Sequence, residues 1–291
     1  MILVVGGSRW SGRALLPALE GRPLRTLVSS EYDAVRYRDQ GIEAVTGEVI
    51  EGRGLDTAMR GVRTLVYLDH VMEELGDPVA NELEAVQNAL IAARSAGVER
   101  VIFLGDIAAR EEAEARQLVA SWAAELAVRQ SDLGWVVLRV PLVIGRGAPV
   151  FESLRRPVDR LPIVPLFRWR RTEAEPVAMS DVIEAIRIAI DEEEILERSF
   201  DVCGADRTNV AAVVRGWGHA AGKHRVYLPV PGWGERFGEQ LAWRAARLPR
   251  RETRLALETL RERQVCTDPS RRFPLPHRPL GYLAALAQAV G

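Results

Sequence analysis

The sequence predicts an α/β fold, with a doubly wound parallel sheet followed by a smaller, mostly helical C-terminal lobe. Three observations lead to this prediction. Short apolar runs alternate with amphipathic helical stretches over residues 1–140. The first run stops at a glycine-rich turn that opens a helical stretch. Beyond residue 147 this alternation ends and prolines cluster at Pro157, Pro162 and Pro165.

The apolar runs of the first half have the length and composition of buried parallel strands, which are continuously rich in Val, Ile and Leu. We expect strands at residues 2–5, 24–28, 42–45, 62–68, 101–104 and 135–140. Helices are expected at 79–95, stopped by Gly97, and at 111–130. Strands that alternate with helices in this way predict parallel pairing through βαβ units.

The second half predicts helices with one further strand. We expect helices at residues 180–190, 210–221, 235–247, 252–263 and 280–290, and a strand at 198–202. Ser180 or Asp181 is the expected N-cap of the first of these helices. This lobe is expected over the carboxyl ends of the strands, where open α/β sheets bind their substrates.

Composition narrows the classes of partner. The chain has 47% apolar residues and a net charge of −1, which favours neither nucleic acid nor an acidic membrane surface. We expect no membrane span and no signal peptide. Cys203 and Cys266 lie in unrelated contexts and predict neither a metal site nor a disulfide framework. A cytoplasmic location is therefore expected.

The turn after the first strand has the character of a phosphate-binding loop. It reads Gly6-Gly7-Ser8-Arg9-Trp10-Ser11-Gly12. Glycines let a backbone turn sharply against a pyrophosphate, and the next helix N-terminus supplies N–H groups with partial positive charge. The loop and its βαβ setting predict a Rossmann domain that binds a dinucleotide. A tight turn without a ligand is the alternative.

The end of the second strand bears on the choice of cofactor. An acidic residue there binds the ribose 2′-hydroxyl of NAD, whereas basic or hydroxyl groups accept the 2′-phosphate of NADP. This strand ends in Ser29 and Ser30, with Glu31 following. Arg9 could reach a 2′-phosphate as a planar donor; alternatively it is a solvated loop charge. We expect NADP(H) to be preferred, with NAD(H) as the second cofactor.

Six segments together resemble the atypical short-chain dehydrogenase/reductase superfamily, in its NmrA-like and complex-I-accessory-subunit-like group. They are the loop at 6–12, Gly47-Glu48-Val49, Leu68-Asp69-His70, the A-A-R-S-A-G-V-E-R-V stretch at 92–101, the stretch at 138–147, and Pro176 to Val182. The resemblance implies that Glu48 and Val49 contact adenine, and that Leu68, Asp69 and His70 line the nicotinamide side. With it we expect a dinucleotide-binding domain at 1–147 and an interleaved substrate or partner lobe at 148–291.

Departures from the superfamily's pattern bear on catalysis. Enzymes of the superfamily use a Tyr-x-x-x-Lys pair on the helix after the fifth strand, where the lysine lowers the tyrosine pKa. Those positions hold Gln117 and Ser121 here, and Gly105-Asp106 replaces the helper serine. None of the five tyrosines is on this helix, and the only lysine is Lys223.

The remaining candidates for acid–base chemistry are Asp69, His70 and Asp106, at the carboxyl ends of strands. Their alternative role is to cap loops or to bond backbone. Two functions follow. The chain is a non-catalytic NAD(P)H-binding redox sensor or structural partner, which the loss of the pair favours. Alternatively, it is an NAD(P)H-dependent oxidoreductase with non-standard groups, acting on an electron-poor acceptor such as a quinone or enone.

Overall fold

A computed structural model describes residues 1–68, 76–231, 244 and 257–291. The chain forms two compact units. Unit 1 comprises residues 1–112, 116–139 and 183–200, and unit 2 comprises 113–115, 140–182 and 201–291. The segment 183–200 thus returns to unit 1, whereas the boundary expected from the sequence assigned it to the second lobe.

Unit 1 is built on a sheet of seven strands in the described residues, in the order β11-β6-β5-β4-β1-β2-β3. The strands span Ile2–Val5 (β1), Leu24–Val28 (β2), Glu43–Thr46 (β3), Thr64–Tyr67 (β4), Arg100–Asp106 (β5), Gly134–Val140 (β6) and Arg198–Asp201 (β11). Pairing from β1 to β5 is parallel. Strands β1 to β3 are added toward one edge of the sheet, and β4 and the strands after it are added toward the other edge. The order of strand addition therefore reverses between β1 and β4. Ligands of doubly wound sheets bind at this point.

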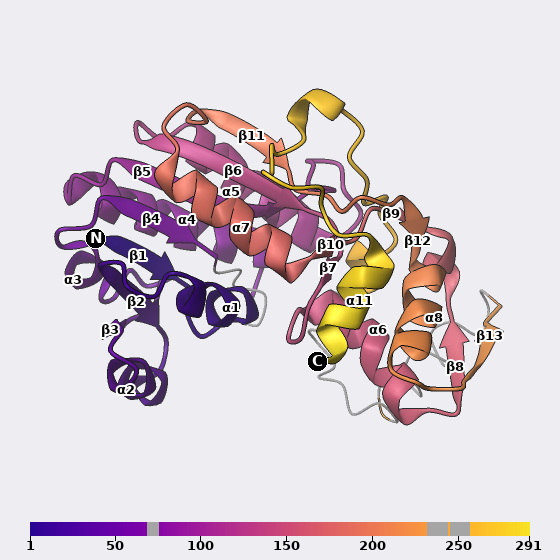
Figure 1. Ribbon diagram of the computed structural model, residues 1–291. Coiled ribbons are helices and arrows are strands. Elements are labelled where there is room, and N and C mark those ends of the chain that lie inside the picture. The colour runs from indigo at the N-terminus through magenta and orange to yellow at the C-terminus, as the bar shows by residue number, and fades with distance from the viewer. Residues whose placement is uncertain (69–75, 232–243, 245–256) are drawn as a thin grey trace. The chain divides into compact units, whose positions relative to one another are not determined.

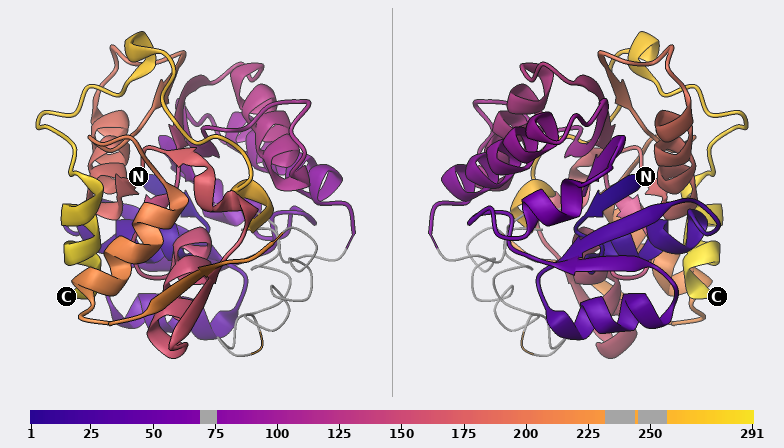
Figure 2. Two further views of the ribbon diagram at one scale, coloured as in Figure 1. Left: turned by 90° about the vertical axis from the view of Figure 1, so that its right-hand side faces the viewer. Right: turned by 90° about the vertical axis from the view of Figure 1, so that its left-hand side faces the viewer.

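Helices cover both faces of this sheet. They span Trp10–Ala18 (α1), Glu31–Asp39 (α2), Leu55–Met59 (α3), Pro78–Ser95 (α4), Arg116–Arg129 (α5) and Met179–Asp191 (α7). Figure 1 shows α1 and α7 on one face, with α4 and α5 on the other. Both views of Figure 2 show α4 and α5 side by side. The predicted doubly wound α/β fold is confirmed.

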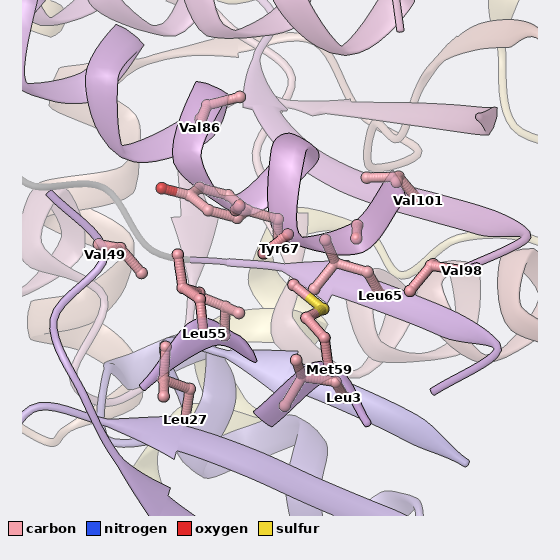
Figure 3. Close-up of a cluster of buried hydrophobic side chains, with 14 of the residues drawn as sticks. Leu3, Leu27, Val49, Leu55, Met59, Leu65, Tyr67, Val86, Val98 and Val101 are labelled. Carbon is pink, nitrogen blue, oxygen red and sulfur yellow. The ribbon is translucent and has the colours of Figure 1, made fainter. Parts of the chain in front are cut away.

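The core of unit 1 lies between the sheet and helices α3, α4 and α5. Its buried side chains alternate along the strands, as Leu3 and Val5 do on β1 and Leu65 and Tyr67 do on β4. In Figure 3 the Tyr67 ring lies among aliphatic side chains, and it stacks on Phe103 with ring centroids 6.0 Å apart. This packing fixes the ends of β1, β4 and β5, from which the loops of the site emerge.

Unit 2 contains shorter elements. Its helices are Pro149–Arg160 (α6), Val210–Ala220 (α8) and Tyr282–Val290 (α11), with 3₁₀ turns at Arg168–Arg171 and Pro269–Arg271. Its strands are Val143–Ile144 (β7), Ile163–Leu166 (β8), Glu173–Ala174 (β9), Val177–Ala178 (β10), Thr208–Asn209 (β12) and Val226–Pro229 (β13). They pair two by two: β10 with β7, β12 with β9 and β13 with β8. The helix expected at 235–247 lies outside the described residues, except for residue 244.

Two expected helix starts are wrong. Helix α5 begins at Arg116 and not at residue 111, because residues 113–115 belong to unit 2, where the Glu114 N–H donates to Glu262 Oε1 at 3.1 Å. Helix α7 begins at Met179, so Ser180 and Asp181 lie inside its first turn. In both places tertiary contacts override local helix signals.

The expectation that the cysteines form no disulfide is also wrong, since Cys203 and Cys266 are bonded to each other. Their separation of 63 residues gives no local signal, and only the folding of unit 2 brings them together. The cysteine argument for a cytoplasmic location is thereby removed, and that location stays a prediction. Among the described residues, no helix has the length and apolar character required to span a membrane.

Candidate functional site

The loop after β1 is a tight glycine turn. Gly6 has a φ of 87°, in the left-handed region that favours glycine, and the Arg9 N–H closes the turn on the Gly6 carbonyl at 3.0 Å. A Cβ at Gly12 would lie 2.3 Å from the Gly6 oxygen, and one at Gly7 would lie 1.9 Å from Thr26 Oγ1. The backbone around these positions therefore has room only for glycine.

The loop ends where α1 begins, and the N-terminus of this helix fits an anion. No side chain among the described residues caps α1 at its N-cap residue, Arg9. The Ser11 hydroxyl is buried and has no hydrogen-bond partner in the described part of the chain. Uncapped N–H groups, the helix dipole and a buried hydroxyl are suitable donors for a pyrophosphate. Ser8 and Trp10 complete the turn as half-buried residues.

Helix α2 ties the loop down from the opposite side. The buried Tyr37 hydroxyl donates to the Gly7 carbonyl at 2.7 Å. The Arg36 guanidinium lies over the Tyr37 ring, 5.1 Å from its centroid, and its Nη2 is 3.5 Å from the Tyr37 oxygen. Arg36 Nε is buried without a hydrogen-bond partner among the described residues. A half-buried cation is thus held beside the phosphate loop.

The end of β2 carries two serines and an acid that is already hydrogen-bonded to other side chains. Ser29 is exposed, whereas the Ser30 hydroxyl caps α2 by accepting from the Asp33 N–H at 3.1 Å. The Glu31 carboxylate accepts from Thr46 Oγ1 at 2.5 Å and from Arg38 Nη1 at 2.7 Å. These hydrogen bonds, that from Thr46 first, lower the pKa of Glu31.

The turn after β3 is similarly rigid on the side predicted to contact adenine. A Cβ at Gly47 would lie 2.3 Å from the Arg53 oxygen, and the Glu48 N–H donates to that same oxygen at 2.9 Å. Val49 is buried, and its carbonyl accepts from Asn88 Nδ2 at 3.3 Å. Glu48 and Val49 are thus positioned by α4 as well as by their own turn.

The end of β4 lies next to the loop. The buried Leu68 donates its N–H to the Val5 carbonyl at 3.1 Å, which extends the pairing of β4 with β1 by one residue. Asp69 and His70, two of the predicted catalytic residues, lie outside the described residues, and their roles stay predictions.

Polar groups at the end of β5 and on α5 occupy the positions that the family resemblance assigns to the acid–base pair. Asp106, the third predicted catalytic residue, is half-buried at the last position of β5. Its N–H donates to the hydroxyl of the buried Ser121, one helical turn along α5 from Gln117. Gln117 Oε1 is buried with no hydrogen-bond partner in the described residues. This region therefore offers an amide and a carboxylate, but no phenol supported by a lysine.

A family model described as NAD(P)H-binding matches residues 6–148. This segment of the chain is therefore similar to NAD(P)H-binding domains. It includes every residue assigned above to the cofactor loop, the turn after β3 and the α5 position. This match and the fold agree with the resemblance to the atypical short-chain dehydrogenase/reductase superfamily.

A curated relative is a ceramide reductase of Caulobacter vibrioides, which is 28% identical over 189 residues. The aligned region covers 64% of this chain and 58% of the relative, so the chain matches less than two thirds of that protein's length.

Solved structures share the fold over the whole chain at low identity. A triphenylmethane reductase of Citrobacter sp. complexed with NADP(H) has a TM-score of 0.73, 18% identity, and coverage of 99% and 100% of the two chains. An NADPH-dependent quinone oxidoreductase of Escherichia coli has a TM-score of 0.73, 14% identity and full coverage of both chains. A nucleoside-diphosphate-sugar epimerase of Staphylococcus aureus has a TM-score of 0.76, 14% identity, and coverage of 98% and 99%.

Sequence reasoning missed Arg36 as a residue of the site. It sits on α2 behind the second strand, and helical spacing alone makes it a surface arginine. The only local signal was its neighbour Tyr37, which the structure buries with its hydroxyl on the Gly7 carbonyl. Residue type alone does not mark this position, because Tyr32 on the same helix is exposed.

Proposed function

We infer that the chain is an NAD(P)H-dependent reductase that gives hydride to an electron-poor acceptor without an acid from a Tyr-x-x-x-Lys pair. The observation that carries this proposal is the pairing of a tightly built dinucleotide loop with Gln117 and Ser121 at the acid–base positions. The names of the similar proteins, which include a triphenylmethane reductase, a quinone oxidoreductase and a ceramide reductase, support a reductase.

The chemistry follows from what these residues can do. The bound dinucleotide supplies a hydride. The glycine loop and the α1 N-terminus bind its pyrophosphate, and the turn at Glu48 and Val49 binds on the adenine side. Ser121 holds the end of β5 by accepting from the Asp106 N–H. The Gln117 amide can orient an acceptor oxygen by a hydrogen bond, but it cannot transfer a proton.

The missing Tyr-x-x-x-Lys pair bears on the class of acceptor. Reduction of a ketone develops an alkoxide, and a positioned acid contributes about 10²- to 10⁴-fold to such a step. A quinone or an enone spreads the incoming charge over its own conjugated system, and water can protonate the product afterwards. We therefore expect quinones and enones to be reduced much faster than isolated ketones.

The deciding experiment follows the absorbance of NADPH in the presence of a benzoquinone, a cyclic enone, a simple ketone and a sphingolipid ketone. The last is included because of the name of the curated relative. Wild type is compared with Gln117→Ala and with Gln130→Ala, a matched glutamine-to-alanine control just beyond the end of α5. We expect quinone turnover that falls in Gln117→Ala and not in the control. Ketone turnover as fast as quinone turnover would contradict the proposal.

The second candidate is a non-catalytic NAD(P)H-binding redox sensor or structural partner. The observation that favours it is that Ser121 is already used structurally, as the acceptor for the Asp106 N–H. Under this alternative, dinucleotide binds and raises the melting temperature, but none of the acceptors is reduced. A ligand at about 100 times its Kd stabilises the folded state by roughly 2.7 kcal/mol, which a thermal shift detects readily.

NADP(H) is proposed as the preferred cofactor, with NAD(H) binding more weakly. Support comes from the half-buried Arg36 beside the loop and from the Glu31 carboxylate, which Thr46 and Arg38 already engage. Arg9 remains the second proposed contact to the 2′-phosphate. A small-molecule substrate or a protein partner is proposed for unit 2.

A further inference from the structure

The disulfide between Cys203 and Cys266 is enclosed in unit 2. Cys203 follows β11 by two residues, and Cys266 precedes the Pro269–Arg271 turn. Both residues are buried, with 3% and 7% of their surface exposed. Nothing in the dinucleotide chemistry of unit 1 calls for this bond, so its own surroundings must indicate what it does.

Backbone pairing on both sides of the bond aligns the two cysteine segments. Before Cys266, the Glu175 N–H donates to the Gln264 carbonyl at 2.8 Å, and the Gln264 N–H donates to the Glu173 carbonyl at 3.0 Å. Beyond Cys266, the Phe273 N–H donates to the Asp201 carbonyl at 3.0 Å, two residues before Cys203. None of these hydrogen bonds involves a sulfur atom.

A buried ion cluster adds a second, independent frame. Glu175 is 3% exposed, and its two carboxylate oxygens accept from Arg207 Nε, at 3.0 Å, and from Arg272 Nη2. Both arginines also reach the cysteine segments, since Arg207 Nη2 donates to the Cys266 carbonyl at 3.4 Å and Arg272 Nη1 to the Gly204 carbonyl at 3.3 Å. The cluster therefore holds residues 203–207 and 264–272 together around one carboxylate.

The cluster also lies close to the sulfurs. The Glu175 carboxylate and the two sulfurs lie within 4.8 Å of one another. The side chains that hold the two segments together are therefore next to the disulfide itself.

We propose that Cys203–Cys266 is a reversible thiol–disulfide modification site, in which the Glu175 cluster keeps the reduced thiols placed for re-oxidation. A dithiol reductant supplies the two electrons. One thiolate of the reductant attacks one cysteine sulfur, which forms a mixed disulfide and releases the other cysteine as a thiolate. The second thiol of the reductant then attacks the reductant's own sulfur in the mixed disulfide and releases the first cysteine. The reductant leaves as a cyclic disulfide, and its two protons remain on the two cysteines.

A metal site is the competing assignment for the same three residues. Its weakness is that both oxygens of Glu175 are already engaged by guanidinium groups, so the carboxylate would have to leave them to bind a cation. A thiophilic metal would then have only two sulfur ligands from this set. The structure thus favours the disulfide, and a zinc measurement separates the two assignments.

The first experiment uses the full wild-type chain. Folded protein is sampled before treatment, after treatment with dithiothreitol, and after re-oxidation with oxidised glutathione. Each sample is then denatured and its free thiols are counted. We expect no free thiols, then two, then none, with a cooperative melt in each state. Closure of a loop of this length predicts a melting temperature roughly 5–10 °C higher in the oxidised protein. The double variant C203S/C266S should melt equally with and without dithiothreitol.

Several results would overturn the proposal. One is two free thiols in air-oxidised wild-type protein. Another is reduced protein that no longer melts cooperatively, because the bond would then be needed for folding and would not be a reversible site. A third is reduced protein that binds one zinc per chain and resists re-oxidation, since this would assign the residues to a metal.

A second experiment tests the role of the cluster in re-oxidation. Arg207→Gln should slow disulfide formation by oxidised glutathione about tenfold, the factor for losing a charge-assisted hydrogen bond that places the segments. The matched control is Arg263→Gln, which removes an exposed ion pair to Glu173 in the same neighbourhood. It should re-oxidise like wild type. Equal rates of disulfide formation in the two variants would show that the Glu175 cluster does not place the thiols for re-oxidation.

Discussion

The two units differ in the groups that join distant parts of the chain. In unit 1, apolar side chains from β1, β4 and β5 pack against α3, α4 and α5, and buried arginines add polar links, such as that from Arg100 Nη1 to the Ala189 carbonyl at 3.0 Å. In unit 2, distant segments are joined by buried carboxylates and by a disulfide. Glu175 binds Arg207 and Arg272, Asp181 accepts from the Leu280 N–H at 2.9 Å, and a disulfide closes residues 203–266.

This difference explains where each unit tolerates change. A hydrophobic core loses stability in proportion to the volume removed, whereas removal of one partner from a buried polar link leaves the other unsatisfied. Unit 1 should therefore be sensitive at its glycine turns and large core residues. Unit 2 should be sensitive at a few charged side chains that resemble surface residues in the sequence.

The largest expected effect is at the phosphate loop. Gly12→Asp places a Cβ 2.3 Å from the Gly6 oxygen and a carboxylate where a pyrophosphate would bind. We expect dinucleotide affinity to fall by more than about 100-fold, equivalent to roughly 2.7 kcal/mol. Titration calorimetry with NADPH measures it. Gly21→Ala, where nothing lies within 4 Å of the added Cβ, is the control and should bind normally. Retained binding in Gly12→Asp would rule out this loop as the pyrophosphate site.

The sequence predicts unit 1 well because its signals are local. Each strand is a short apolar run, and each crossover is bounded by a glycine such as Gly97, whose φ is 73°. The glycine loop could be identified for the same reason. Family resemblance also placed Gln117 and Ser121 on α5, although the start of that helix was set five residues too early.

The parts that the sequence could not predict depend on partners far away in the chain. Cys203 and Cys266 are 63 residues apart, and Glu175 is 97 residues from Arg272. Neither pair has a periodicity or a spacing that marks it. Arg36 is a local case of the same problem, because its position beside the loop is visible only once the Tyr37 hydroxyl is found on Gly7.

The second largest effect is expected in unit 2, at the buried Glu152. Its burial raises the pKa, but hydrogen bonds from Arg155, Arg156 and the Gly147 N–H outweigh this and hold the pKa below the ordinary value of 4.5. A lowered folded-state pKa stabilises the protein above the unfolded-state value, and this stability is lost as the pH falls through the folded-state pKa. We expect Glu152→Gln to cost about 2 kcal/mol at neutral pH.

Urea denaturation at a series of pH values measures this effect. The difference between wild type and Glu152→Gln should be constant above the ordinary pKa of 4.5 and should shrink below it. Glu192→Gln, at an exposed position outside any described ion pair, is the control. A difference that does not change with pH would assign the cost to packing and not to the charge.

The next effect sharpens the comparison within unit 1. Arg36→Gln removes the cation beside the phosphate loop. NADPH affinity should then fall about tenfold, because its 2′-phosphate loses a charge-assisted hydrogen bond. NADH has no 2′-phosphate, so its affinity should stay the same. Arg9→Ala is measured in parallel, since Arg9 is the other proposed contact. Equal losses for both cofactors would make Arg36 a support for the loop. No loss in either variant would remove the basis for an NADP(H) preference.

The smallest effect is expected at an ion pair on the surface of unit 1. Arg22 donates to both oxygens of Asp191 at 2.7 and 2.8 Å, which joins the turn before β2 to the end of α7. These hydrogen bonds are the first cause of a lowered Asp191 pKa, so the pair stabilises the protein above the ordinary value of 3.8 and is lost as the pH falls below it. Because the Asp191 side chain is 53% exposed, solvent screens the pair, and Asp191→Asn should lower the free energy of unfolding by less than about 1 kcal/mol.

Urea denaturation at low and high salt measures the cost of Asp191→Asn. This cost should shrink in high salt, whereas the cost at the buried Glu152 should not. A cost of Asp191→Asn equal to that of Glu152→Gln would show that geometry outweighs burial in this protein, and the contrast drawn between the two units would have to be abandoned.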